Sequence, residues 1–394
     1  MKIADRLNHV GEYYFSSKLR EIDVLNKEGK NIINLGIGSP DLPPHPDVIA
    51  ELQNQAARPD THAYQNYKGI PEFRNAIASW YEDWYGVNLD PAGEILPLIG
   101  SKEGIMHICM SFINPGDGVL IPNPGYPTYR SAASIAGAEI LEYSLTAENN
   151  WYPDFNSLAN LVRDKKVKLL FANYPHMPTG KLPDIKVFEQ LVAFAQKHDI
   201  LIVHDNPYSF ILNENPVSML SVKGAIEVVL ELNSLSKSHN MAGWRLGMLC
   251  GRKELIDIVV RFKSNMDSGM FLPVQLAAVK ALSLGKEWFE SLNAVYKRRK
   301  QLVEQILQSL GCKYASEQAG LFVWAKCSDR YADGYALSDE ILYGAKVFLT
   351  PGGIFGSEGN RYIRLSLCAS EENLENAANR IRNYLELNGA IAAK

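Results

Sequence analysis

The chain has 394 residues, of which 46% are hydrophobic and 21% charged, with a formal net charge of −4. This composition is typical of a globular protein long enough for more than one domain, and it excludes a disordered or fibrous chain. The small negative charge gives no electrostatic reason to bind nucleic acid or an anionic membrane, so we expect neither partner.

The chain begins with MKIADRLNHVGEYYF, which lacks the apolar core of a signal peptide. No run of about 18 apolar residues follows, so we predict no membrane span and a cytoplasmic location. The five cysteines are scattered, without a C-x-x-C pair. We therefore expect free thiols in a reducing compartment, and neither disulfides nor a metal site.

Short apolar runs alternate with stretches of helical period through the middle of the chain. The runs predicted as strands are EILPLIG (94–100), GVLIP (118–122), VKLLFA (167–172), ILIVH (200–204) and IEVVLEL (226–232). The stretches predicted as helices are 70–86, 101–114 and 186–199. Because the apolar runs are continuous, the pattern predicts strands buried on both faces, in a mostly parallel sheet covered by helices.

From about Gly285 the pattern changes to a long helix (287–311), followed by a shorter α+β segment that ends in a helix (373–387). We predict a large domain of residues 46–284 and a small domain of residues 1–45 plus 285–394. The basic run KRRK (297–300) falls in the long helix, and we expect it to form a solvated face.

Each predicted strand is followed by a polar or glycine-rich turn. In chain order the turns are GSKEG (100–104), PNPGYPTY (122–129), NYPHMPTG (173–180), DNPY (205–208) and NSLSK (233–237). Because the carboxyl ends of parallel strands meet at one edge, these five turns are predicted to converge on one site.

These motifs resemble the pyridoxal 5′-phosphate (PLP) dependent aminotransferases of the aspartate aminotransferase type, which are fold type I and class I/II. The similarity runs from NLGIGSPDLPP (34–44) to GNRYIRLSL (359–367), and its most specific part is SLSKSHNMAGWRLG (234–247). The resemblance implies an α/β fold. It has a mostly parallel (mixed) seven-stranded sheet between helices in a large PLP-binding domain, beside a smaller α+β domain.

The resemblance implies that Lys237 forms a Schiff base with PLP and, once freed by the substrate, moves the proton at the reacting carbon. Desolvation and neighbouring cations would make this amine nucleophilic. Asp205 would pair with the ring nitrogen and keep it protonated. The alternatives for its HDN context are a helix N-cap or part of a metal site, but no second ligand cluster lies nearby in the sequence. Tyr208 would donate to the phenolic oxygen of the cofactor.

The phosphate contacts implied by the resemblance are Ser101, Lys102, Ser234 and Arg245. Ser101 and Lys102 follow a strand at a predicted helix N-terminus, which suits an anion, and the guanidinium of Arg245 suits a phosphate dianion. The pattern is not a P-loop, because G-x-x-x-x-G-K-[ST] is absent. Tyr64 resembles a tyrosine that reaches the phosphate of the neighbouring subunit, which implies a homodimer with shared active sites.

Three further positions complete the implied site. Tyr126 would stack on the pyridine ring, although an aromatic residue there is also compatible with a core position. Arg364 would grip the substrate's α-carboxylate, and Gly38 would offer its backbone beside it.

One position departs from the family pattern, because Met177 stands where an asparagine normally precedes PTG. A thioether cannot donate the hydrogen bond that this asparagine gives to the cofactor. Asn173, His176 or a water molecule is expected to compensate, and the loss should tune the activity without abolishing it.

The function implied is a ping-pong aminotransferase that moves the amino group of an L-amino acid to a 2-oxo acid. One alternative is a PLP-dependent β-C–S lyase of the same fold. Another is a PLP-binding regulatory protein, which we disfavour because Lys237, Asp205 and Arg364 are all retained and because little chain precedes residue 34. The motif around Lys237 is similar to alanine, aromatic and N-succinyl-diaminopimelate aminotransferases, but it identifies no donor.

Overall fold

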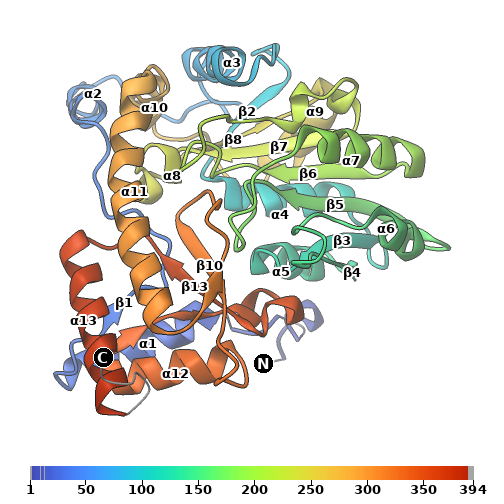
Figure 1. Ribbon diagram of the computed structural model, residues 1–394. Coiled ribbons are helices and arrows are strands. Elements are labelled where there is room, and N and C mark those ends of the chain that lie inside the picture. Colours follow the sequence, from blue (N-terminus) through green and yellow to red (C-terminus); the bar gives the residue numbers. More distant parts are fainter. Residues whose placement is uncertain (1, 9, 13, 389–394) are drawn as a thin grey trace.

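The computed structural model describes residues 2–8, 10–12 and 14–388, and its largest sheet has seven strands (Figure 1). In order across this sheet the strands are β2 (Ile95–Leu98), β8 (Gly247–Cys250), β7 (Val229–Ser234), β6 (Leu201–Asp205), β5 (Val167–Asn173), β3 (Gly118–Asn123) and β4 (Glu139–Ser144). The predicted α/β class and the seven-stranded sheet are confirmed.

Strand directions explain why the sheet is mixed and yet has one functional edge. Strands β7, β6, β5, β3 and β4 are mutually parallel, whereas β8 is antiparallel to both β7 and β2. Strand β2 therefore runs in the same direction as β7, and six strands end at the same edge. Three strands differ from the sequence prediction. Residues Ala225–Glu227 form the short helix η3 before β7 begins, and β8 was not predicted because only four residues carry it. Strand β4 was not predicted either, because this edge strand alternates exposed and buried residues and has no continuous apolar run.

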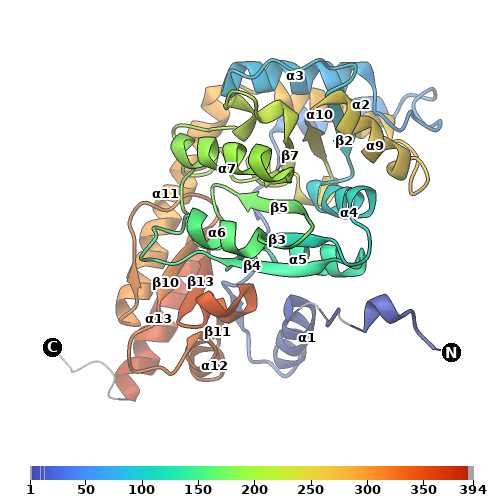
Figure 2. The same ribbon diagram turned by 90° about the vertical axis from the view of Figure 1, so that its right-hand side faces the viewer.

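Helices cover both faces of the sheet, as the apolar runs predict; in Figure 2, α6 and α7 lie on one side of it and α4 and α9 on the other. One face carries α3 (Pro71–Tyr85), α6 (Phe155–Val162), α7 (Ile185–His198) and α10 (Leu272–Leu282). The other carries α4 (Ser101–Phe112), α5 (Pro127–Ile135) and α9 (Lys253–Lys263). Helix α3 shows the cause: Phe73, Ile77, Trp80 and Tyr81 recur at helical spacing and are buried.

A second set of elements lies below the large sheet in Figures 1 and 2. Its four-stranded sheet has the order β12 (Thr350–Pro351), β13 (Tyr362–Ser366), β10 (Phe322–Lys326) and β9 (Lys313–Tyr314). Its helices are α11 (Lys286–Ser309), α12 (Gly334–Ala345) and α13 (Glu371–Leu387).

The N-terminal segment packs with this second set. Helix α1 (Tyr14–Lys27) contacts α12 through Lys18 and Asp339, and β1 (Ile33–Asn34) pairs in parallel with β11 (Val347–Phe348). Helix α2 (Pro46–Ala56) instead packs on α10. The domain boundaries at residues 45/46 and 284/285 stay a prediction.

The expectation of a solvated KRRK face is wrong for one residue. Lys297 and Arg298 are exposed, but Arg299 is buried and holds Asp41 through two hydrogen bonds of 2.6 and 2.8 Å. Since Arg299 and Asp41 are far apart in the sequence, helical periodicity alone could not reveal the pair.

No helix of the described residues is long and apolar enough to cross a membrane. The five cysteines are free: four are buried and Cys368 is half-buried, as the sequence predicts. The cytoplasmic location stays a prediction.

Candidate active site

A cavity of about 600 Å³ lies at the edge where the parallel strands end. Twelve of the thirteen predicted site residues line it: Gly38, Ser101, Lys102, Tyr126, Asn173, Met177, Asp205, Tyr208, Ser234, Lys237, Arg245 and Arg364. The turns that follow β2, β3, β5, β6 and β7 therefore converge, as the sequence predicts.

Lys237 lies on the short helix α8 (Leu235–Ser238), directly after β7. Ser234 caps this helix by accepting from the Ser236 amide, and the Trp288 indole donates to the Ser238 carbonyl at 2.8 Å, which anchors α8 to α11. The Lys237 ammonium donates to the Gly38 carbonyl at 2.6 Å.

Burial lowers the pKa of Lys237; Cys368 opposes this effect, and the positive charges of Arg364 and Arg245 lower the pKa further. The neutral amine is therefore more populated than at an exposed lysine, and it is the neutral form that acts as a nucleophile or a base.

Asp205 ends β6 and is buried. Its Oδ2 accepts from the Tyr129 hydroxyl at 2.8 Å, while its Oδ1 is buried without a hydrogen-bond partner among the described residues. Burial raises the pKa of Asp205 to about 6, against the Tyr129 hydrogen bond and the charge of His204. A buried carboxylate with one unused oxygen is suited to a cationic N–H group.

Asn173 links the ends of two strands. Its side-chain amide donates to the Asp205 carbonyl at 2.6 Å, and its Oδ1 accepts from the Met177 amide at 2.7 Å. It thereby fixes the backbone that carries both residues.

A cluster of cations and amide donors lies at the start of α4. Gly100 precedes Ser101 with φ of 80°, and a Cβ at Gly100 would come within 2.0 Å of Arg245 Nη2. Burial, with a contribution from the nearby Arg245, lowers the pKa of Lys102. The helix N-terminus and two adjacent cationic side chains make this end of the cavity suited to a phosphate.

Arg364 lies on β13 and also lines the cavity. Its guanidinium donates to the Gly36 carbonyl at 2.8 Å and lies over the Phe322 ring, 3.7 Å from the centroid. Its Nη1 also lies 3.2 Å from Met177 Sδ. The residue that departs from the family pattern thus contacts the arginine expected to bind the substrate.

His176 does not line the cavity. It is buried, and its Nδ1 lies 2.8 Å from the Thr179 hydroxyl. Of the two side chains considered as substitutes for the missing asparagine, only Asn173 reaches the cavity.

Tyr64 is the predicted residue that its own chain does not bring to the site. Its side chain is 93% exposed and does not line the cavity. Its expected role concerns a second subunit, so this position leaves the prediction open.

Several residues that line the cavity are not predicted from the sequence. Tyr129 lies one helical turn after Tyr126, so the spacing in YPTY could have indicated it. Phe15, Leu19, Phe322 and Phe355 come from the second set of elements, and no local motif marks them.

A separate cluster of Glu103, His107 and Asp267 lies close enough together to consider a metal ion. The Lys263 ammonium is 2.6 Å from Asp267 Oδ1, which already supplies a cation there. The expectation of no metal in the cavity itself stays a prediction.

The cavity fits PLP by its chemistry. Asp205 offers an unused buried oxygen for the ring nitrogen, the start of α4 offers an anion site, and Lys237 offers an amine.

Comparisons with known proteins agree with this chemistry. The family model "Aminotransferase class I and II" matches residues 30–381. LL-diaminopimelate aminotransferase from Dehalococcoides mccartyi is 40% identical over 98% of this chain and 99% of its own length, and the Aquifex aeolicus enzyme of the same name is 38% identical over 97% and 99%. None of these names supports the lyase alternative.

Two solved structures extend the similarity to the whole fold. Substrate-bound BacF from Bacillus subtilis is 36% identical, with a TM-score of 0.92 over 97% of this chain and 98% of that one. A mutant of Thermus thermophilus aspartate aminotransferase is 26% identical, with a TM-score of 0.90 over 98% and 100%.

Proposed function

Because this chain belongs to the class I and II aminotransferases and is therefore a PLP-dependent aminotransferase, we propose that Lys237 is its catalytic lysine. The observation that carries this proposal is that the Lys237 amine, the Asp205 carboxylate and the Arg364 guanidinium line a single cavity. The substrates are an amino acid and a 2-oxo acid.

When bound, PLP supplies an aldehyde for the amino group and an electron-withdrawing ring. Asp205 Oδ1 would hold the ring N–H. Ser101, Lys102, Ser234 and Arg245 would hold the phosphate, and Tyr126 would stack on the ring.

Arg364 would bind the α-carboxylate of the substrate as a bidentate partner. Its guanidinium is already oriented by the Gly36 carbonyl and the Phe322 ring. Fixing the carboxylate also fixes the orientation of the α-carbon, so that its proton can face Lys237.

Lys237 would remove the α-proton of the donor and return a proton to the product. The lowered pKa of its amine supports this role, because a base must lose its own proton near neutral pH. Tyr208, three residues after Asp205, would donate to the phenolic oxygen of the cofactor.

As the amino donor we propose LL-diaminopimelate, on the ground that relatives 38–40% identical over nearly the whole chain carry that name. A large apolar amino acid is the second candidate. Two features of the cavity favour it. The lining includes the apolar residues Phe15, Leu19, Ile37, Phe322 and Phe355, and among the described residues that line the cavity only Asp205 carries a carboxylate.

A panel of donors against 2-oxoglutarate decides between these candidates. Purified enzyme with PLP would be offered LL-diaminopimelate, phenylalanine, methionine, alanine and aspartate, with glutamate formation as the readout. LL-diaminopimelate should give the largest kcat/KM. A kcat/KM for phenylalanine or methionine ten times that for LL-diaminopimelate would show instead that the donor is a large apolar amino acid.

The catalytic role of Lys237 is tested separately. Lys237→Ala should lower turnover by about 10²–10⁴-fold, because a general acid–base catalyst is lost. Borohydride treatment of the wild-type holoenzyme should fix the cofactor on the peptide that contains Lys237. Fixation on another lysine would contradict the assignment.

We further propose a homodimer in which Tyr64 of one subunit reaches the phosphate site of the other. Tyr64 is exposed and does not line the cavity of its own subunit, which supports this arrangement.

A further inference from the structure

A buried ion pair lies behind the active-site strand. His204 on β6 and Glu231 on β7 are register partners in neighbouring parallel strands, and both side chains are 0% exposed. His204 Nδ1 lies 2.8 Å from Glu231 Oε2. None of the roles proposed above uses this pair.

The hydrogen bonds around Glu231 favour its ionised form. Its carboxylate accepts from the Tyr81 hydroxyl at 3.0 Å, the Ser218 hydroxyl at 2.9 Å and the Met219 amide at 2.9 Å. A carboxylate that accepts several such bonds is stabilised as the anion. The Nδ1 of His204 must then carry a proton in order to donate to it.

The second nitrogen of His204 faces an acceptor as well. Its Nε2 lies 3.2 Å from the Tyr174 carbonyl, which can only accept. Both ring nitrogens therefore face acceptors, and the imidazolium form is the one that can donate to both.

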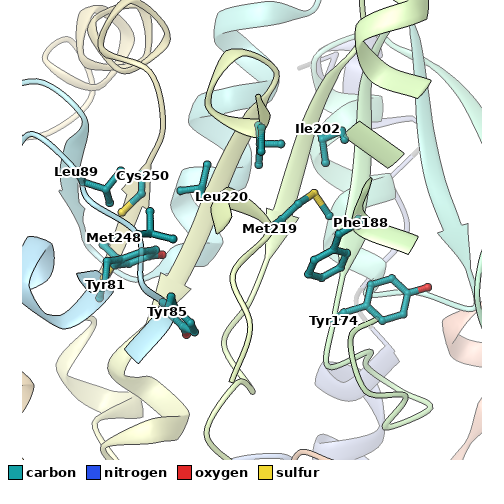
Figure 3. Close-up of a cluster of buried hydrophobic side chains, with 14 of the residues drawn as sticks. Tyr81, Tyr85, Leu89, Tyr174, Phe188, Ile202, Met219, Leu220, Met248 and Cys250 are labelled. Atoms are coloured by element: carbon teal, nitrogen blue, oxygen red, sulfur yellow. The ribbon is translucent and has the colours of Figure 1, made fainter. Parts of the chain in front are cut away.

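The surroundings of this pair are apolar. Figure 3 shows Tyr81, Phe188, Met219 and Met248 in this core, and the Phe188 ring lies 5.0 Å from that of His204. Tyr81, Tyr85 and the buried thiol of Cys250 also interact with Glu231, and burial raises the pKa of each of them, which keeps them neutral. Little screening therefore acts on the imidazolium charge.

His204 is also the residue directly before Asp205. Successive side chains of a strand point to opposite faces, so the imidazolium lies behind the sheet while the Asp205 carboxylate faces the cavity with Tyr129. The Glu231 carboxylate is one strand further away, beside Leu232, which is the register partner of Asp205. The cation of the pair is thus nearer to Asp205 than the anion.

We propose that His204 is a positioning residue whose imidazolium, held by Glu231 behind the sheet, keeps the Asp205 carboxylate ionised for the ring nitrogen of PLP. This inference rests on the proposed role of Asp205. The charge of His204 opposes the effect of burial on the Asp205 pKa, in agreement with the proposal.

The stability of the fold does not by itself explain why an ion pair is buried at this place. Buried ion pairs are often replaceable by apolar residues of similar volume without loss of stability, because desolvation offsets the attraction between the charges. An electrostatic effect on a neighbouring functional carboxylate does require the charge.

The first experiment locates the protons in the unaltered holoenzyme. Neutron diffraction from crystals exchanged into deuterium oxide at pH 7.5 should show deuterium on both nitrogens of His204. An unoccupied Nδ1 or Nε2, or a deuterium bound to Glu231, would overturn the proposal without any variant.

The second experiment measures the protonation of the cofactor's ring nitrogen directly. PLP labelled with ¹⁵N in the ring is bound to each variant, and the nitrogen chemical shift is followed from pH 6 to pH 9. His204→Asn/Glu231→Gln removes both charges and keeps donor–acceptor pairs, so the proton affinity of the ring nitrogen should fall about three- to tenfold. His204→Asn alone leaves the buried anion and should lower this affinity further. Tyr81→Phe keeps both charges and should leave it within about twofold of wild type.

The control Asp205→Asn separates this inference from the proposed function. If the nitrogen stays protonated in Asp205→Asn, the role of Asp205 fails. If the ring nitrogen loses its proton in Asp205→Asn but keeps the wild-type proton affinity in the folded double variant, the role of His204 fails and that of Asp205 stands. A melting temperature lowered in all variants without the predicted order of nitrogen shifts would show that the pair is only structural.

Discussion

The guanidinium of Arg364 lies over the ring of Phe322, 3.7 Å from the ring centroid. Phe322 is on β10 and Arg364 on β13, and the two strands are paired so that Trp324 is opposite Arg364. The ring can occupy this position only because residue 38 is a glycine. A Cβ at Gly38 would come within 2.1 Å of Phe322 Cζ. A loop near the N-terminus therefore controls the orientation of an arginine more than 300 residues away.

Gly38→Ala should displace Phe322 and weaken its contact with Arg364. Since a desolvated cation–π contact contributes about 1–2 kcal/mol, KM for the amino donor should rise about 5- to 30-fold. The affinity for PLP should change little, because the phosphate site lies elsewhere in the cavity. Gly11→Ala is the matched control, as a Cβ there meets no atom within 4 Å. Equal kinetic effects of the two substitutions would contradict this explanation.

The sequence predicted the parts of the site that depend on local order. Continuous apolar runs indicated parallel strands, and parallel strands bring Ser101, Asn173, Asp205 and Lys237 to one edge whatever the details of packing. The specific motif around Lys237 then supplied the chemistry through its resemblance to a family.

The parts that were missed depend on contacts between distant segments. Phe322 and Phe15 reach the cavity only because the N-terminal and C-terminal segments pack together. Arg299 belongs to a basic run that the sequence predicts to be solvated, and only the position of Asp41 explains its burial. Strand β8 was missed because four residues give almost no periodic signal, and β4 was missed because it is an edge strand without a continuous apolar run.

The buried carboxylate of Asp205 should destabilise the enzyme when PLP is absent. Burial raises its pKa from 3.8 to about 6. Between these values the folded state binds more protons than the unfolded state. The contribution of this carboxyl group to the free energy of unfolding is therefore fully present below pH 3.8 and is lost as the pH rises through 6. At pH 8, apo Asp205→Asn should be more stable than wild type by roughly 1–3 kcal/mol.

Urea unfolding of both apo proteins at pH 4 and pH 8 measures this difference. The gain from Asp205→Asn should be small at pH 4 and appear at pH 8, while the holo variant loses activity. Tyr129→Phe serves as a comparison, because it removes a hydrogen bond that lowers the Asp205 pKa and should shift the loss of stability to higher pH. A gain independent of pH would show that the carboxylate charge is not its cause.

Met177→Asn should restore a hydrogen-bond donor beside the cofactor. A bond to a charged oxygen contributes about 1.5–3 kcal/mol, which corresponds to roughly one to two pKa units. The pH midpoint of the bound cofactor's absorbance change should fall by that amount, and turnover should change with it. Met177→Leu removes the sulfur contact with Arg364 without adding a donor, so its midpoint should stay at the wild-type value. An unchanged midpoint and turnover in Met177→Asn would show that this position does not tune the cofactor.

Arg299 joins α11 to the loop that carries Gly38. Its guanidinium binds both oxygens of Asp41 and donates to the Leu367 carbonyl at 3.0 Å. Arg299→Ala removes these hydrogen bonds but leaves the Asp41 carboxylate in contact with solvent, so it should lower the free energy of unfolding by about 1.5–3 kcal/mol. Arg298→Ala removes an exposed pair with Glu371 and should change it by less than about 1 kcal/mol. Similar melting temperatures for the two variants would contradict the structural role of Arg299.

Tyr64 tests whether two subunits share each site. Lys102 and Arg245 line a second cavity as well as the first, so the phosphate end is accessible from outside the subunit. If Tyr64 of the partner donates to the phosphate, Tyr64→Phe should weaken PLP binding about 10- to 150-fold, since a hydrogen bond to a charged group contributes about 1.5–3 kcal/mol. Tyr67→Phe, in the same exposed loop, should leave the affinity unchanged.

Mixing two inactive variants distinguishes a partner contact from an effect within one subunit. A Tyr64→Ala subunit keeps its own Lys237, and a Lys237→Ala subunit keeps its own Tyr64. In a mixed dimer, the site that contains Lys237 would receive Tyr64 from the other subunit, so activity should return at low PLP concentration. If Tyr64 acts within its own subunit, every site of the mixture lacks one of the two residues and activity stays absent. A protein that sediments as a monomer with full activity would exclude the shared site altogether.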